Sequence, residues 1–118
     1  MKYSLLFFLF VFSVLLTNAQ NVSDLPAGKY EAKLKSGPNK WDKGDIIIMD
    51  DTHYRISSSD EVGEYKFSVA AQRIFFTSGP LKSAFTKVAV SNGKPVIILP
   101  QEENGSLGLK AEIWASKQ

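Results

Sequence analysis

The sequence predicts an all-β protein, an antiparallel up-and-down barrel of eight strands. Side chains alternate strictly between apolar and polar over residues 29–35 and again over 64–69, which is typical of strands with one buried face. Turn-forming residues separate such segments at intervals of about 8–12 residues. Short connections favour the pairing of consecutive strands, and closure of the sheet removes its exposed edges. A β-sandwich is the alternative architecture.

Residues 1–19 have the layout of a cleaved secretory signal peptide. Lys2 carries a positive charge, residues 5–16 are apolar apart from Ser13, and Thr17 and Ala19 are the small residues before the cleavage point. The apolar stretch is shorter than the roughly 20 residues of a membrane-spanning helix. We therefore expect a secreted or periplasmic protein with no membrane insertion after cleavage, and one domain over residues 20–118.

The expected strands follow one another along that domain. The first covers residues 29–35 and the fourth covers 64–69, both with strict alternation. Shorter runs of β-branched and aromatic residues predict strands at 45–50, 53–57, 73–77, 85–91 and 95–99. Alternation over residues 107–114 predicts the last one. Asn92-Gly93 lies between two apolar runs and predicts a tight hairpin, because both residues tolerate positive φ.

The same alternation predicts which side chains face the barrel interior. Most of them are large, so we expect a filled core rather than a wide cavity. Inward tyrosines either mark a small polar pocket or place their hydroxyls at the barrel ends. The residues expected to face inward are Tyr30, Leu34, Ile46, Ile48, Tyr54, Ile56, Tyr65, Phe67, Val69, Ile74, Phe76, Val88, Val90, Val96, Ile98, Leu109 and Ile113.

Composition argues against several classes of function. The chain has no cysteine and a single histidine, His53, so we expect no metal site, no cofactor and no catalytic residues. Without Lys2 it carries 13 basic and 12 acidic side chains, a net charge of +1, and no basic stripe interleaved with aromatics is visible in the sequence. We therefore expect no nucleic-acid binding and no enzyme activity, with an unrecognised hydrolase or isomerase as the alternative.

Several segments resemble small secreted lipocalin-like domains. Gly28-Lys29-Tyr30 is similar to the glycine–x–aromatic signature that opens such barrels, with Tyr30 where tryptophan is usual. Tyr54-Arg55-Ile56, Gly63-Glu64-Tyr65 and the segment 74–81 are similar to a pattern in the same group. The resemblance implies a calycin-type barrel and the binding of a ligand.

Five aromatic residues are the candidate contacts for a ligand or partner. Phe75, Phe85 and Trp114 fall out of phase with the core faces, Trp41 lies in the long connection 36–44, and Tyr54 is an inward tyrosine. The alternative is that Trp41 folds over an open barrel end and that Trp114 packs under residues 22–26.

The sequence thus predicts a monomeric, non-enzymatic binding module. It would bind a small apolar ligand at the barrel mouth, or a secreted or envelope protein through an aromatic surface. The connections 36–44 and 100–106 are the expected contact loops. Asn21 and Asn104 begin glycosylation acceptor motifs, which matter only in a eukaryotic source.

Overall fold

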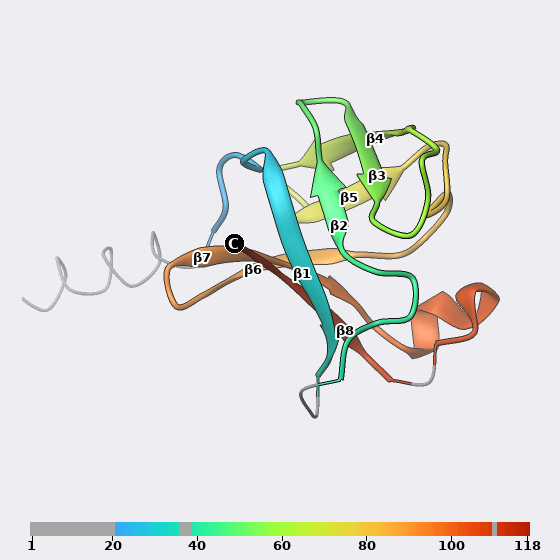
Figure 1. Ribbon diagram of the computed structural model, residues 1–118. Coiled ribbons are helices and arrows are strands. Elements are labelled where there is room, and N and C mark those ends of the chain that lie inside the picture. The colour runs from blue at the N-terminus through green and yellow to red at the C-terminus, as the bar shows by residue number, and fades with distance from the viewer. Residues whose placement is uncertain (1–20, 36–38, 110) are drawn as a thin grey trace, which may run out of the picture.

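The computed structural model describes residues 21–35, 39–109 and 111–118, so the predicted leader, residues 1–19, lies outside it. Within these residues the chain forms eight strands and one short 3₁₀ helix (Figure 1). The elements are β1 (Gly28–Leu34), β2 (Ile46–Ile48), β3 (His53–Ile56), β4 (Gly63–Ser68), β5 (Arg73–Phe76), β6 (Lys87–Ser91), β7 (Lys94–Leu99), η1 (Glu102–Leu107) and β8 (Ile113–Lys117).

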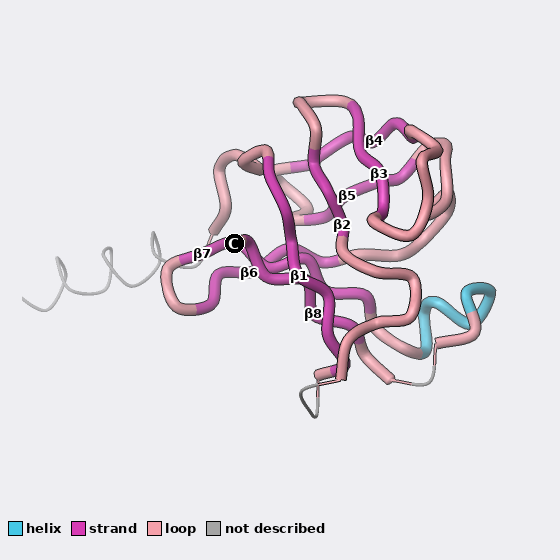
Figure 2. Tube along the Cα trace, in the orientation of Figure 1, coloured by secondary structure: helices cyan, strands magenta, loops and turns pink. Residues whose placement is uncertain are grey.

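All eight strands belong to one antiparallel sheet, which curls into a nearly closed barrel (Figures 1 and 2). The order β5-β4-β3-β2-β1-β8-β7-β6 is a meander, with β8 returning to pair with β1 from Tyr30↔Lys117 to Leu34↔Ile113. The predicted up-and-down barrel is confirmed. The sandwich alternative is wrong, because the strands are not divided between two packed sheets.

The barrel closes between β5 and β6 through a side chain rather than a regular ladder. The hydroxyl of Thr86 accepts a hydrogen bond from the Ile74 N–H at 2.8 Å and donates one to the Ile74 carbonyl at 2.7 Å. One backbone bond, from the Val88 N–H to the Gln72 carbonyl at 2.8 Å, also joins the two sides. We call this junction between β5 and β6 the seam. Thr86 and Ile74 are fully buried, so these bonds replace water for both backbone groups of Ile74.

Local predictions hold where the sequence pattern is strict. In β1, Tyr30 and Ala32 are fully buried while Lys29 is exposed. The predicted hairpin joins β6 to β7, with Asn92 and Gly93 at φ 54° and 75° between the paired residues Ser91 and Lys94. These are the conformations of a two-residue turn whose twist matches that of the strands.

The predicted strand over residues 107–114 is wrong for most of its length. Residues 102–107 form η1, Gly108 ends it at φ 66°, and β8 begins only at Ile113. The alternation of Leu107, Leu109 and Ala111 arises in a connection whose leucines pack partly against the core. Ile113 faces inward and Trp114 outward, as predicted.

The phase of β7 also differs from the prediction. Ile97 and Leu99 belong to the core, and they lie opposite Ala115 and Ile113 of β8. Val96, expected inward, is buried outside the main core cluster, and Ile98 is half-buried. The run from Pro95 to Leu99 is apolar throughout, so no alternation could fix its phase.

Two other residues expected inward are exposed, and both lie at or near the ends of their strands. Val69 follows the last residue of β4 and is 51% exposed, and Val90 lies near the β6–β7 hairpin tip and is 37% exposed.

One barrel end is covered by the segment before β1. Val22 and Leu25 are buried in the core cluster. The Gln72 side chain accepts a bond from the Val22 N–H and donates one to the Val22 carbonyl, both at 2.8 Å. Trp114 pairs with Lys33, toward the opposite end of β1, so its expected packing under residues 22–26 is wrong.

Candidate ligand site at the barrel mouth

The other barrel end carries a cavity of about 300 Å³. It lies between the β1–β2 connection and the segment that joins η1 to β8. Figures 1 and 2 show η1 beside this connection. The lining residues are Leu34, Lys40, Trp41, Asp42, Lys43, Leu107, Gly108, Leu109, Ala111 and Ile113.

Trp41 forms one wall of this cavity. Its backbone N–H donates to the Ala32 carbonyl and its carbonyl accepts from the Gly44 N–H, both at 3.0 Å. The residue is 6% exposed and belongs to the core cluster. Trp41 therefore covers the barrel end, as the alternative to an exposed contact predicted, and one part of it still borders the cavity.

A buried carboxylate holds the Trp41 connection in place. Asp45 Oδ1 accepts a bond from the Ala32 N–H at 3.1 Å, and Oδ2 lies 3.5 Å from Lys29 Nζ. The Asp45 N–H donates to Ser57 Oγ at 2.8 Å, and Ser58 Oγ donates to the Lys43 carbonyl. The wall is thus tied to β1 and to the end of β3, which favours a preformed site.

Asn104 supports the opposite wall. Its Oδ1 accepts a bond from the Phe85 N–H at 2.7 Å, and its Nδ2 donates to the carbonyls of Phe85 at 2.9 Å and Pro100 at 2.7 Å. Asn104 is 1% exposed, so its glycosylation motif is inaccessible in the folded chain, whereas Asn21 is exposed. These bonds fix η1, and with it Leu107, against the barrel.

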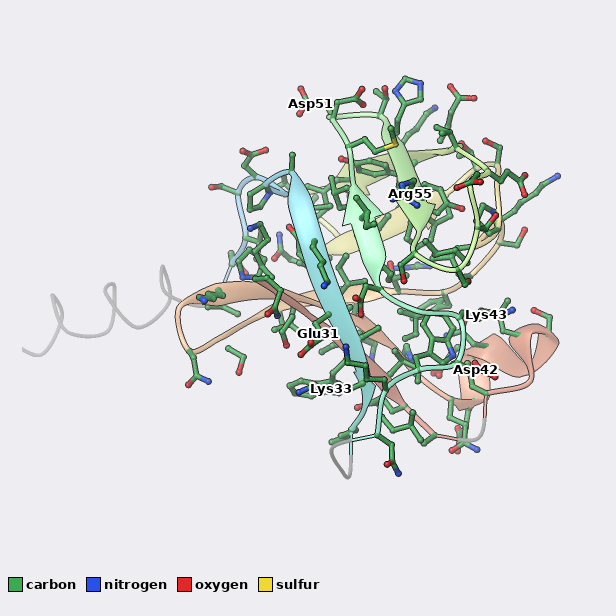
Figure 3. The ribbon with its side chains drawn as sticks, in the orientation of Figure 1. Glu31, Lys33, Asp42, Lys43, Asp51 and Arg55 are labelled. Atoms are coloured by element: carbon green, nitrogen blue, oxygen red, sulfur yellow. The ribbon has the colours of Figure 1, made fainter. Side chains whose placement is uncertain are left out.

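Part of the cavity is charged. Lys40, Asp42 and Lys43 are among its lining residues, and Lys40 Nζ lies 3.5 Å from Glu31 Oε2. Asp42 and Lys43 project from the β1–β2 connection on the side of η1 (Figure 3). A lining that combines apolar side chains with three charged ones suits a ligand that has both an apolar part and a polar part.

The five predicted contact residues do not form one surface. Tyr54 is fully buried, its hydroxyl donates to the Ser78 carbonyl and accepts from the Leu81 N–H, both at 2.8 Å, and burial raises its pKa to about 12. Direct contact between Tyr54 and a partner is therefore incompatible with this fold. Phe75 and Phe85 lie together beside Arg73, while Trp114 lies on the outer face of β8.

Trp114 borders a shallow groove on the outside of β1 and β8. Its Nε1 donates to Glu112 Oε2 at 2.6 Å, and Lys35 Nζ lies 5.8 Å from the ring centroid. The groove is also lined by Glu31, Lys33, Leu34, Ser116 and Gln118. Because Trp114 is already held by neighbours of its own chain, we place the candidate site at the barrel mouth instead.

His53 has a local structural role in the β2–β3 turn. Asp50 accepts bonds from the Thr52 and His53 N–H groups at 2.9 and 2.8 Å, and His53 Nδ1 lies 2.9 Å from Asp50 Oδ1. The Thr52 N–H bond, followed by the His53 side chain, lowers the pKa of Asp50 to about 2. The Thr52 hydroxyl belongs to the same network, 2.9 Å from His53 Nδ1 and 3.3 Å from Asp50 Oδ1. Asp50, Thr52 and His53 therefore hold one another in an exposed turn.

Among the residues that the structure describes, no three histidine, aspartate or glutamate side chains are grouped to hold a metal ion. No helix in this part of the chain has the length and hydropathy needed to cross a membrane. No family model, curated protein or solved structure matches the chain at a significant level.

Sequence reasoning missed the residues that shape the mouth. Leu107 and Leu109 were expected in a strand, and nothing local marked Asn104 and Asp45 as buried. Their partners lie 19 and 13 residues away along the chain, beyond the reach of a periodicity argument.

Proposed function

We propose that the chain is an exported, non-enzymatic binding module with a lipocalin-like barrel that holds a small apolar ligand at its mouth. The observation that carries this proposal is the cavity between Trp41 and the η1–β8 connection, which is lined by apolar side chains together with Lys40, Asp42 and Lys43. The leader-like residues 1–19 support export to the periplasm or the cell exterior.

The dimensions of the cavity limit the ligand. A volume of about 300 Å³ is at the lower end of small-molecule sites. It holds about ten groups of the size of a water molecule, if each takes roughly 30 Å³. The interior of the barrel is filled by side chains, among them the fully buried Tyr30, Tyr54 and Ile46, so the ligand sits at the mouth and not along the axis.

Titration with straight-chain alcohols tests the proposal. Trp41 emission is read in a Trp114→Phe background, so that only the cavity tryptophan reports. Affinity should rise about fourfold for each added methylene, the equivalent of about 0.8 kcal/mol. The increase should stop near about ten carbons, when the cavity is full.

A filled cavity provides the matched control. Ala111→Phe places a ring in the cavity and should abolish the response, while Ala70→Phe, on an exposed turn, should leave it unchanged. Alcohols that bind equally well to both variants, or an emission that no alcohol changes, would contradict a ligand site at the mouth.

A further inference from the structure

Arg73 is held in a fixed orientation on the outside of the barrel seam. Its guanidinium carbon lies 4.6 Å from the ring centroid of Phe75 and 3.9 Å from that of Phe85. Its Nε donates a bond to the Thr86 carbonyl at 3.3 Å. Two rings and one carbonyl therefore position the group, and the terminal nitrogens remain as a donor pair.

The seam brings further cations to the same place. The bonds that pair Gln72 with Val88 and Ile74 with Thr86 place Arg73 across from Lys87. On the other side of β5, Phe75 pairs with Lys66 of β4. We call Lys66, Arg73, Phe75, Phe85 and Lys87 the Arg73 patch.

The positive charge of this patch is not neutralised within the described residues. None of its three cations lies within 4.0 Å of a carboxylate there, whereas Lys29, Lys33, Lys35 and Lys40 all have acidic partners. Phe75 is 41% exposed, which is high for a phenylalanine. The Arg73 patch thus combines a prearranged donor pair, two flanking lysines and an accessible apolar surface.

We propose that the Arg73 patch binds an acidic peptide segment of a partner protein. A carboxylate would accept a bidentate bond from the terminal nitrogens of Arg73, and an apolar side chain next to it would cover Phe75. The lysines on either side would add attraction that depends on ionic strength.

The geometry favours a peptide over a nucleic acid. Single-stranded nucleic acids bind by stacking successive bases on several free aromatic faces. Here Arg73 occupies one face of each ring, and the remaining exposed surface of Phe75 suits a single apolar side chain. An acidic peptide uses the guanidinium edge and leaves this stack intact.

The test uses a short fluorescein-labelled peptide of alternating glutamate and leucine, with fluorescence anisotropy as the readout. The wild-type protein should bind this peptide. Arg73→Lys keeps the positive charge but loses the bidentate donor pair and the stacking on the two rings, so it should bind about tenfold more weakly. Lys94→Gln removes an exposed cation at the hairpin tip and should change affinity by less than about twofold.

Two further measurements keep the proposal falsifiable if Arg73→Lys is poorly folded. In the wild type, the peptide should shift the NMR resonances of Arg73 Nε and of the Thr86 and Phe75 amides. A peptide with glutamine in place of glutamate should not bind. Equal binding by Arg73→Lys, equal binding of the glutamine peptide, or stronger binding of single-stranded DNA would each overturn the proposal.

Discussion

Replacing Thr86 with valine should destabilise the barrel at its seam. Valine has nearly the same shape as threonine but has no hydroxyl. The change therefore leaves the Ile74 N–H and carbonyl without the partners they have at 2.8 and 2.7 Å. Ile74 is fully buried, so water does not replace the hydroxyl.

The magnitude follows from these two groups. Each buried polar group left unpaired costs about 1–3 kcal/mol, so the free energy of unfolding should fall by about 3 kcal/mol. That is a large part of the stability of about 5–15 kcal/mol that is typical of a small domain. Thr86→Ser keeps the hydroxyl and loses one methyl group, and should cost only about 1 kcal/mol.

Urea denaturation measures the effect, with exchange of the Ile74 amide as a local readout. Thr77→Val is the matched control, because the Thr77 hydroxyl makes one exposed bond of 3.3 Å to the Glu64 carbonyl. The control should change stability by less than about 0.5 kcal/mol. A Thr86→Val protein as stable as Thr77→Val, with slow exchange at Ile74, would refute the side-chain closure of the barrel.

Three other outcomes are expected. Asn104→Asp turns a buried donor into an acceptor facing two carbonyls and should cost about 3 kcal/mol or more in urea denaturation; a neutral effect would contradict the support of η1. The pKa of Asp50 is lowered from 3.8, its value in the unfolded chain, so the ionised carboxylate stabilises the fold above that pH. This stability should be lost as the pH falls toward 2, whereas Asp50→Asn should show no such loss. An NMR titration midpoint near 3.8 for Asp50 would disprove the turn network. Burial raises the pKa of Tyr54 and Tyr65 to about 12 and that of Tyr30 above its usual range. The stability that these neutral phenols contribute is therefore complete below pH 10.0, the pKa of an unperturbed tyrosine, and declines as the pH rises toward 12. Phenolate absorbance already present near pH 10.0 would contradict this expectation.

Much of the fold could be predicted because local patterns determine local structure. Strict alternation in β1 and β4 and the Asn92-Gly93 turn each carry their information within a few residues. β7 has apolar residues on both faces, and its phase is set only by its pairing with β6 and β8. Leu107 and Leu109 alternate like a strand, yet the bonds of Asn104 hold that region in another conformation.

The candidate sites were harder to predict because they join distant residues. Trp41 could be singled out as an aromatic residue in a long loop, but its partners Leu107 and Leu109 come from the far end of the chain. Phe75 and Phe85 were recognised as out of phase, whereas their contact with Arg73 depends on the closure of the seam. Tyr54 was misassigned as a contact, because periodicity does not show that its hydroxyl is bonded to Ser78 and Leu81.

Native mass spectrometry of the protein purified gently from its own host tests the binding function most directly. We expect a species heavier than the chain of residues 20–118 by one discrete small-molecule mass, and loss of that mass in Ala111→Phe but not in Ala70→Phe. A bare chain from the host that also fails to take up straight-chain alcohols, or an added mass that Ala111→Phe retains, would contradict a ligand site at the barrel mouth.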